Sequence, residues 1–223
     1  MAARILSLSI IVILIPIISI ATVIHVPGDC TTIQAAVDSC YGGDTVMVAP
    51  GVYSGDGNLN ISIIGKSITV MSAEGPISTI VDGGIIDNGF NIIAGGVYAS
   101  VLQGFTIRNV SRGVYCDSSS AVLKNLIIQD FLSKGFHFDG FLYDPPLAFT
   151  VEKCMVRQEQ QSYQGMGVGI FGARSVNVSV NGSLFSDCLY GMEFHTLNNQ
   201  VPIFDIEKCV IANSLLDGIW THS

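Results

Sequence analysis

Gly104-Phe-Thr-Ile-Arg-Asn109 is the first of five related phrases in the second half of the chain. Each is an apolar run with strand-like alternation that closes on a polar residue. The other four are Asn125-Leu-Ile-Ile-Gln-Asp130, Lys153-Cys-Met-Val-Arg-Gln158, Gly182-Ser-Leu-Phe-Ser-Asp187 and Lys208-Cys-Val-Ile-Ala-Asn213. Their starts lie 21, 28, 29 and 26 residues apart. A repeat of this length, with strands and no helical period, predicts a β-solenoid.

A second phrase, a glycine that leads a short alternating strand, follows each of the first. The five copies are Gly113-Val-Tyr-Cys-Asp117, Gly135-Phe-His-Phe-Asp139, Gly167-Val-Gly-Ile-Phe171, Gly191-Met-Glu-Phe-His195 and Gly218-Ile-Trp-Thr-His222. Two strand phrases in each repeat fit a coil whose neighbours stack about 4.8 Å apart through backbone hydrogen bonds.

Stacking of the first phrase predicts two inward columns of side chains. They are Phe105, Leu126, Cys154, Ser183 and Cys209, followed by Ile107, Ile128, Val156, Phe185 and Ile211. The closing residues Asn109, Asp130, Gln158, Asp187 and Asn213 fall at one turn. Asn and Asp tolerate left-handed backbone, so we interpret this third column as structural.

Composition and charge limit the partners. The chain has 223 residues, 49% of them hydrophobic and 13% charged, with a net charge of −8. Only ten residues are Lys or Arg, and they are scattered, which argues against nucleic acid as a partner. The same charge disfavours anionic membranes. We expect one all-β domain over residues 22–223, a right-handed parallel β-helix of about seven coils.

Residues 1–21 have the composition of a secretory signal peptide. Arg4 supplies a basic start, residues 5–20 are apolar, and Ser19-Ile20-Ala21 places small residues where a signal peptidase cleaves. A retained membrane anchor is the alternative, but Pro16 and the small-residue exit favour cleavage. We therefore expect a secreted or extracellular protein that has no membrane contact after cleavage.

Export to an oxidising compartment makes the six cysteines candidates for disulfides. Cys30 and Cys40 bracket residues 31–39, which predict a short amphipathic helix with Thr31 or Thr32 as its cap. We expect a disulfide between these two cysteines. Cys154 and Cys209 lie two coils apart, about 9.6 Å, which is too far for a bond. The sequence does not pair Cys116 or Cys188.

Four segments near the N-terminus carry a family resemblance. They are Thr32-Ile-Gln-Ala-Ala-Val-Asp38, Gly43-Asp-Thr-Val-Met-Val-Ala-Pro-Gly-Val-Tyr53, Ile64-Gly-Lys-Ser-Ile-Thr-Val-Met71 and Ser78-Thr-Ile-Val-Asp-Gly83. This order resembles the start of right-handed parallel β-helix proteins of the pectin-lyase-like superfamily, and most of all the opening of pectin methylesterases. The resemblance implies that the helix caps the first coil. It covers about residues 30–84, whereas residues 101–223 match only as generic β-helix repeats.

The family's catalytic residues do not carry over. Gln129-Asp130-Phe131 is similar to a piece of a pectin methylesterase motif, but the following Leu132-Ser-Lys-Gly135 departs from it. The expected arginine motif is missing. Gly135-Phe-His-Phe-Asp139 is not the Gly-His-Gly of polygalacturonases, and no local motif establishes the calcium cluster of pectate lyases. A shared fold does not license activity.

The second phrase nevertheless predicts a candidate site, because side chains alternate across a strand. Two residues of each copy should point inward. They are Val114 and Cys116, Phe136 and Phe138, Val168 and Ile170, Met192 and Phe194, and Ile219 and Thr221. One outward column would then be Tyr115, His137, Gly169, Glu193 and Trp220, and its neighbour Asp117, Asp139, Phe171, His195 and His222. A one-residue error in register would turn all of them inward.

Three interpretations of this outward face stay open. It is an ordinary solvated face, a groove in which aromatic rings and hydrogen-bonding groups bind a polysaccharide, or a catalytic site. In the last case His137 with Asp139, or Glu193 with His195, would perform acid–base chemistry. Asp117 and Asp139 could also bind calcium, although without a loop motif. We predict no cofactor and no metal ligand set.

Four sequons, at Asn60, Asn109, Asn177 and Asn181, are candidate glycosylation sites in a secreted protein. The sequence ends directly after a strand phrase, and nothing there resembles a cap over the last coil. Solenoids need such a cover, so we expect a fragment or a truncated gene product. Two function classes remain. We favour a non-catalytic β-helix that binds polysaccharide or a cell-surface glycan, or serves as an interaction module. The alternative is a divergent or truncated lyase, esterase or glycoside hydrolase.

Overall fold

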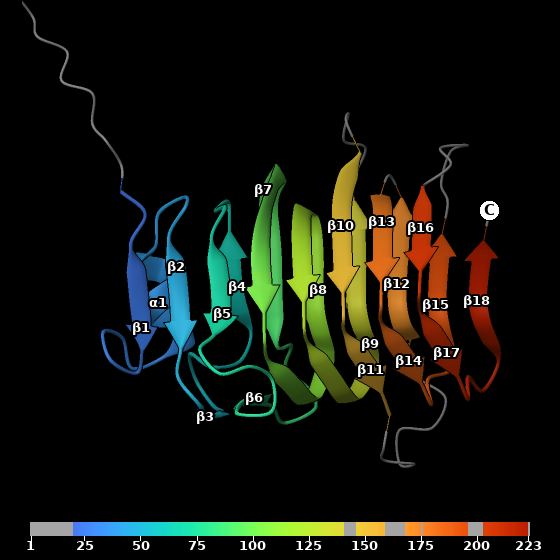
Figure 1. The fold of residues 1–223 in the computed structure, drawn as a ribbon, viewed down its shortest axis with the longest axis horizontal. Helices are drawn as coiled ribbons and strands as arrows, with labels where there is room; N and C mark the ends of the chain where they lie inside the picture. Colours follow the sequence, from blue (N-terminus) through green and yellow to red (C-terminus); the bar gives the residue numbers. More distant parts are fainter. Residues whose placement is uncertain (1–19, 141–145, 159–167, 175, 196–202, 223) are drawn as a thin grey trace, which may run out of the picture.

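The computed structural model describes residues 20–140, 146–158, 168–174, 176–195 and 203–222. Its strands stack into a parallel β-solenoid of about seven coils, which confirms the expected architecture (Figure 1). Every strand pairing is parallel and joins successive coils. The predicted signal peptide falls almost wholly on residues 1–19, outside the described residues. Within the described part of the chain, no helix has the length and apolar character needed to cross a membrane.

The strands form three faces of the solenoid. The first face consists of β1 (Val23–Val26), β2 (Thr45–Val48), β5 (Thr69–Ser72), the ends of β7 (Phe90–Gln103) and β8 (Thr106–Lys124), β10 (Leu147–Glu152), β13 (Val176–Asn181) and β16 (Phe204–Glu207). The second consists of β3 (Gly51–Tyr53), β6 (Thr79–Asp82), the starts of β8 and β9 (Ile127–Gly140), β11 (Met155–Arg157), β14 (Leu184–Ser186) and β17 (Val210–Ala212).

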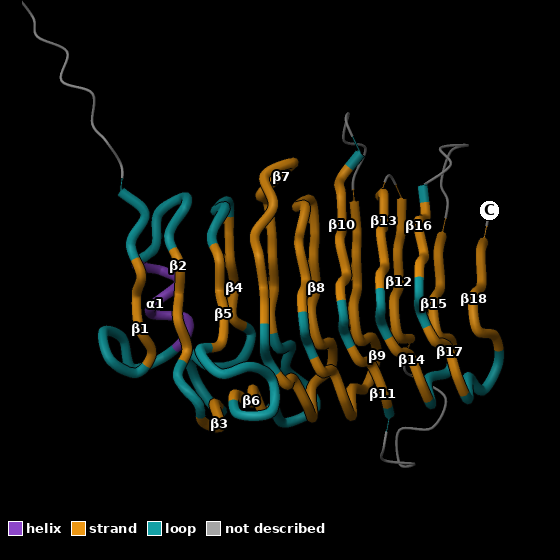
Figure 2. The backbone as a smooth tube through the Cα atoms, viewed as in Figure 1, coloured by secondary structure: helices purple, strands orange, loops and turns teal. Residues whose placement is uncertain are grey.

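The third face carries the candidate site. It consists of β4 (Ile61–Ile64), the start of β7, the middle of β8, the rest of β9, β12 (Val168–Arg174), β15 (Tyr190–His195) and β18 (Asp217–His222). The long strands β7, β8 and β9 each pass round a corner of the coil and so contribute to two faces, as the tube view shows (Figure 2).

The core fills the solenoid with the columns expected from the first phrase. Ile107, Ile128, Val156 and Phe185 are fully buried and lie in register on successive coils. Phe105 and Leu126 are fully buried as well, and Cys154 and Ser183 are 3% exposed. In the last described coil the equivalents Cys209 and Ile211 are only partly buried. These columns confirm the predicted inward register of the second face.

The predicted turn column is confirmed at four of its five positions. Asn109, Asp130, Asp187 and Asn213 have φ angles between 53° and 58°, the left-handed region that Asn and Asp tolerate better than most residues. The Asn213 amide also donates to the Asp187 carboxylate on the preceding coil at 3.2 Å. The column therefore turns the chain and links its coils, as the structural interpretation requires.

Helix α1 (Ile33–Ser39) lies at the N-terminal end of the solenoid, against β1, β2 and β4 (Figure 1). Thr32 is its N-cap, because its hydroxyl accepts a hydrogen bond from the Ala35 amide at 3.2 Å. Ile33, Ala36 and Val37 point into the core, on the face that the sequence predicts. All six cysteines are thiols in this structure, so the expected bond between Cys30 and Cys40 is not seen and stays a prediction.

A column of glycines brings the coils into close contact beside the third face. Its members Gly89, Gly113, Gly135, Gly169, Gly191 and Gly218 lie on successive coils. A Cβ added to Gly89, Gly113 or Gly191 would meet the carbonyl oxygen of the next glycine in the column at 2.6 Å. Real Cβ atoms do not approach backbone so closely, so the corner excludes a side chain at these three positions.

We expect Gly135→Ala to lower the free energy of unfolding by about 1–3 kcal/mol, as overpacking does in tight cores. Its new Cβ would lie 2.5 Å from Val156 Cγ1 and 2.8 Å from the Gly169 oxygen. Gly218→Ala is the matched control in the same column, because its nearest contact, with Ile211 Cγ2, is an ordinary 3.5 Å. Thermal unfolding of both variants tests this. Equal midpoints would contradict the close approach.

Candidate functional site

The register of the third face defines a central column that points away from the core. It runs through Tyr115, His137, Phe171, Glu193 and Trp220. The residues between them in the strands point inward as predicted, since Val114, Cys116, Phe136, Phe138 and Ile170 are fully buried. The inward assignment is thus confirmed for β8 and β9, and a one-residue slip is excluded there.

One part of the predicted register is wrong. We expected Gly169 in the central column and Phe171 beside it, but Phe171 pairs with His137 and Glu193 and so belongs to the central column itself. Val168 pairs with Lys134 rather than lying level with Val114. The physical reason is the glycine column, in which Gly169 takes the corner where the next coil's backbone approaches.

An outer column lies two residues further along each strand. Its members in order are Asp117, Asp139, Ala173, His195 and His222. The backbone of His222 pairs with that of His195 as predicted, but its side chain is outside the described part of the structure. Ile219 is aligned with Met192 and Thr221 with Phe194, yet Ile219 is 49% exposed because it belongs to the last described coil.

Aromatic contacts connect the central and outer columns across five coils. The ring centroids of Tyr115 and His137, of His137 and Phe171, and of Phe171 and His195 are each 4.9 Å apart. His195 lies 6.2 Å from Trp220, whose ring stacks on Tyr190 at 4.9 Å. This continuous row of rings, which we call the aromatic row, contains six residues: Tyr115, His137, Phe171, His195, Trp220 and Tyr190.

Two cations flank the aromatic row, and sequence reasoning missed them. Arg112 and Lys134 pair in register on neighbouring coils. The Arg112 guanidinium lies 5.2 Å from the Tyr115 ring centroid, and Lys134 Nζ lies 4.4 Å from that of Phe171, both within cation–π range. The sequence does contain a signal for them. Arg112, Lys134 and Tyr190 each directly precede a member of the glycine column, so they occupy equivalent positions on their coils.

Two carboxylates lie on the other side of the row. Asp117 and Asp139 pair in register on the same two coils as the cations. Burial and then these two carboxylates raise the pKa of Tyr115 above its ordinary value, so its hydroxyl stays protonated. Like charges stacked directly opposite each other destabilise a sheet. Two such pairs occur here, Arg112 with Lys134 on one side of the row and Asp117 with Asp139 on the other. Two unfavourable pairs at one place mark a specialised surface.

His137 lies at the centre of this charge pattern. It is only 9% exposed, and Nδ1 has no hydrogen-bond partner among the described residues. Burial, followed by the charges of Lys134 and Arg112, lowers the pKa of His137 from 6.5 to about 3, so its imidazole is neutral. Burial and Arg112 also lower the pKa of Lys134, while Glu193 opposes this shift. A buried ring nitrogen without a partner is a candidate contact for a ligand.

Glu193 and His195 form a short contact between their side chains. Glu193 Oε1 lies 2.6 Å from His195 Nε2, and the two side chains are 12% and 35% exposed. Such a contact orients the imidazole and could support proton transfer. The other predicted pair, His137 and Asp139, lies on one strand, β9. Among described residues no cluster of three or more metal-ligating side chains occurs.

The four sequon asparagines differ in how their side chains are engaged. Asn60 and Asn109 donate at 2.7 Å to the carboxylates of Asp87 and Asp82 on neighbouring coils. Asn177 accepts from the Ile203 amide at 3.3 Å, and Asn181 makes a longer 3.4 Å contact with Glu207. A glycan on Asn60 or Asn109 would break a short hydrogen bond between coils. Glycosylation at the four sites stays a prediction.

Comparison with known proteins identifies the class of fold. No family model matches the chain, and no curated protein matches it significantly. Pectate lyase Pel9A is similar in structure, with a TM-score of 0.58 and 14% identity over 80% of this chain and 53% of that one. An alginate lyase from Paenibacillus sp. gives a TM-score of 0.47 at 12% identity, covering 91% and 99% of the two chains. The catalytic domain of a GH87 alpha-1,3-glucanase in complex with nigerose gives 0.43 at 14% identity, covering 85% and 45%.

The protein therefore has a parallel β-helix fold, which it shares with that pectate lyase. The likeness to the pectate lyase shows a shared fold, and it confirms at that level the resemblance carried by the N-terminal segments. The chain spans about half the length of that pectate lyase.

The lowered pKa of His137 predicts a pH-dependent stability. The unfolded chain binds this proton below about pH 6.5, whereas the folded protein binds it only near pH 3, so the contribution of His137 is lost as the pH falls through this range. His137→Phe keeps a ring between Tyr115 and Phe171 but cannot titrate. Relative to the variant, the wild type should lose about 1.4 kcal/mol of unfolding free energy per pH unit between about pH 6 and pH 4. Urea unfolding at several pH values measures this, and a constant difference would contradict it.

Proposed function

We propose that the protein is a secreted, non-catalytic parallel β-helix that binds polysaccharide on its third face. The aromatic row carries this proposal, because its rings continue over five successive coils, with neighbouring centroids about 4.9 Å apart. The spacing between neighbouring rings is close to the length of one sugar ring. Apolar ring surface beside fixed polar groups is the usual composition of a site for a small polar ligand.

The polar groups beside the row supply the hydrogen bonds that sugar hydroxyls need. Asp117, Asp139 and Glu193 offer acceptors, while the Tyr115 hydroxyl and the cations Arg112 and Lys134 offer donors. Strands rather than loops hold these groups, so little order has to be gained when a ligand binds. A polysaccharide would lie along the solenoid axis and contact several coils at once. The pectate lyase that shares the fold is named for activity on a polysaccharide, which is consistent with such a ligand.

A second candidate function rests on one contact. The 2.6 Å pair of Glu193 and His195 would suit proton transfer to or from a bound sugar, as in a polysaccharide lyase or hydrolase. Binding is favoured over catalysis, because the family's catalytic motifs do not occur in the sequence. Assays for reducing sugar, unsaturated uronate and released methanol on the wild type and Glu193→Gln separate the two functions.

Replacement of ring surface at either end of the row tests the binding surface. We expect Trp220→Ala and Tyr115→Ala each to weaken polysaccharide binding at least tenfold, about 1.4 kcal/mol, because each removes a stacking surface. Binding to neutral and acidic polysaccharides would be measured by glycan array and by titration calorimetry. Trp220 is the only tryptophan, so its fluorescence also reports directly on occupancy of the row.

Ile86→Ala is the control for this experiment, since Ile86 is 83% exposed and lies outside the third-face columns. Thermal unfolding shows whether each variant is folded. A wild type that binds no polysaccharide, or Trp220→Ala and Tyr115→Ala variants that bind as well as the wild type, would rule out the third face as the binding surface.

A further inference from the structure

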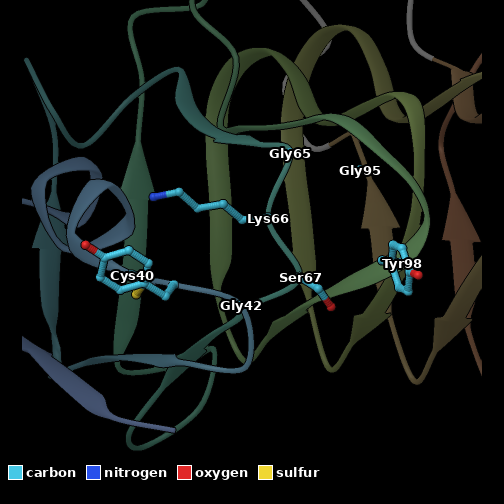
Figure 3. Close-up of a pocket in the computed structure, with 8 residues that line it drawn as sticks. Cys40, Gly42, Gly65, Lys66, Ser67, Gly95 and Tyr98 are labelled. Atoms are coloured by element: carbon cyan, nitrogen blue, oxygen red, sulfur yellow. The ribbon is translucent and has the colours of Figure 1, made fainter. Parts of the chain in front are cut away.

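A cleft of about 400 Å³ opens toward the N-terminal end of the solenoid, on the coils that precede that of Tyr115 (Figure 3). Three turns that are distant in sequence form it: residues 40–42 after helix α1, residues 65–67 after β4, and residues 95–98 within β7. Ile64 and Ile93, which precede the second and third turns, continue the outer column of Asp117 and Asp139 toward the N-terminus. The cleft thus lies round the corner from the third face.

Glycines occur in all three turns that line the cleft. Gly65 has a φ of 62°, which favours glycine, and an added Cβ on Gly95 would collide with the buried Ser119 hydroxyl. A Cβ on Gly42 would meet nothing within 4 Å, so the space beside it is empty. Figure 3 shows these three glycines along the cleft between Cys40 and Tyr98.

Exposed aromatic and aliphatic side chains surround the cleft. Tyr41 is 79% exposed and Tyr98 is 74% exposed, and no hydrogen bond of either hydroxyl occurs among the described residues. Ile64 and Val97, next to lining residues in the sequence, are 60% and 49% exposed. Such a local concentration of exposed apolar surface on one corner of a soluble domain marks a place of contact.

The described lining of the cleft includes one cation, and its ammonium is bound at the end of helix α1. Lys66 is the charged residue among its described lining, and its ammonium donates to the Val37 and Asp38 carbonyls at 2.8 and 2.9 Å, at the end of α1. Figure 3 shows this side chain extending toward the helix. Ser67 is also engaged, through its hydroxyl and the Ala99 carbonyl. Burial raises the pKa of the Cys40 thiol, so it carries no charge.

We propose that this cleft is a second carbohydrate site, which takes neutral sugar residues of a polysaccharide. Tyr41 and Tyr98 offer ring faces for the C–H surfaces of the sugar and hydroxyls for its oxygens. The Lys66 ammonium is bound to carbonyls at the end of α1, which distinguishes the cleft from the third face, where Arg112 and Lys134 lie over the rings. This proposal does not depend on the proposed function of the third face.

The test uses neutral hexasaccharides of glucose, xylose and mannose, with a galacturonate hexamer for comparison, and measures binding by titration calorimetry. We expect at least one neutral hexasaccharide to bind the wild type, and its affinity to fall at least tenfold in Tyr41→Ala and in Tyr98→Ala. Both side chains are exposed, so both variants should unfold at the wild-type temperature. Trp220→Ala should retain this binding, and Trp220 fluorescence should not change during the titration.

Several results would overturn the proposal. One is that no neutral hexasaccharide binds, and another is that the two tyrosine variants bind as well as the wild type. Loss of neutral-sugar binding in Trp220→Ala alone would assign that binding to the third face. If instead the third face does not bind polysaccharide, the result differs. Trp220→Ala would then leave all polysaccharide binding unchanged, while Tyr41→Ala and Tyr98→Ala would still reduce it.

Discussion

The close approach of successive coils at the glycine column is the constraint on which this structure depends. At Gly89, Gly113 and Gly191 the backbone of the next coil occupies the space where a Cβ would be. Backbone hydrogen bonds along the solenoid axis fix the distance between coils, and the glycine corner fixes their offset along each strand. Together they determine which side chains enter the core and which form the central column.

The same constraint explains the unfavourable features of the candidate site. Parallel coils in exact register place equivalent side chains directly on top of one another, so Arg112 meets Lys134 and Asp117 meets Asp139. A sheet optimised for stability alone would alternate these charges. Here the cations lie over the rings of Tyr115 and Phe171, and His137 is held neutral between them. Stability given up at one surface is the usual mark of a binding or catalytic role.

Much of the fold could be predicted from the sequence. Helix α1, its threonine cap at residue 31 or 32, the turn column and the inward residues of the second face all follow from spacing and residue type. The register of β12 could not, because residues 165–169 contain three glycines and the pattern does not show which one takes the corner. His137 is packed between Tyr115 and Phe171 from two other coils, and the cleft joins three turns, so neither could be recognised within one repeat.

The histidines offer the most direct test of the claim that the third face binds polysaccharide. The chain has four, of which His137 and His195 belong to the aromatic row while His25 lies on β1 at the far end of the solenoid. Imidazole resonances would be followed by NMR while an oligosaccharide that binds the protein is added. The account predicts that those of His137 and His195 shift and that of His25 does not. Binding that leaves His137 and His195 unchanged would contradict it.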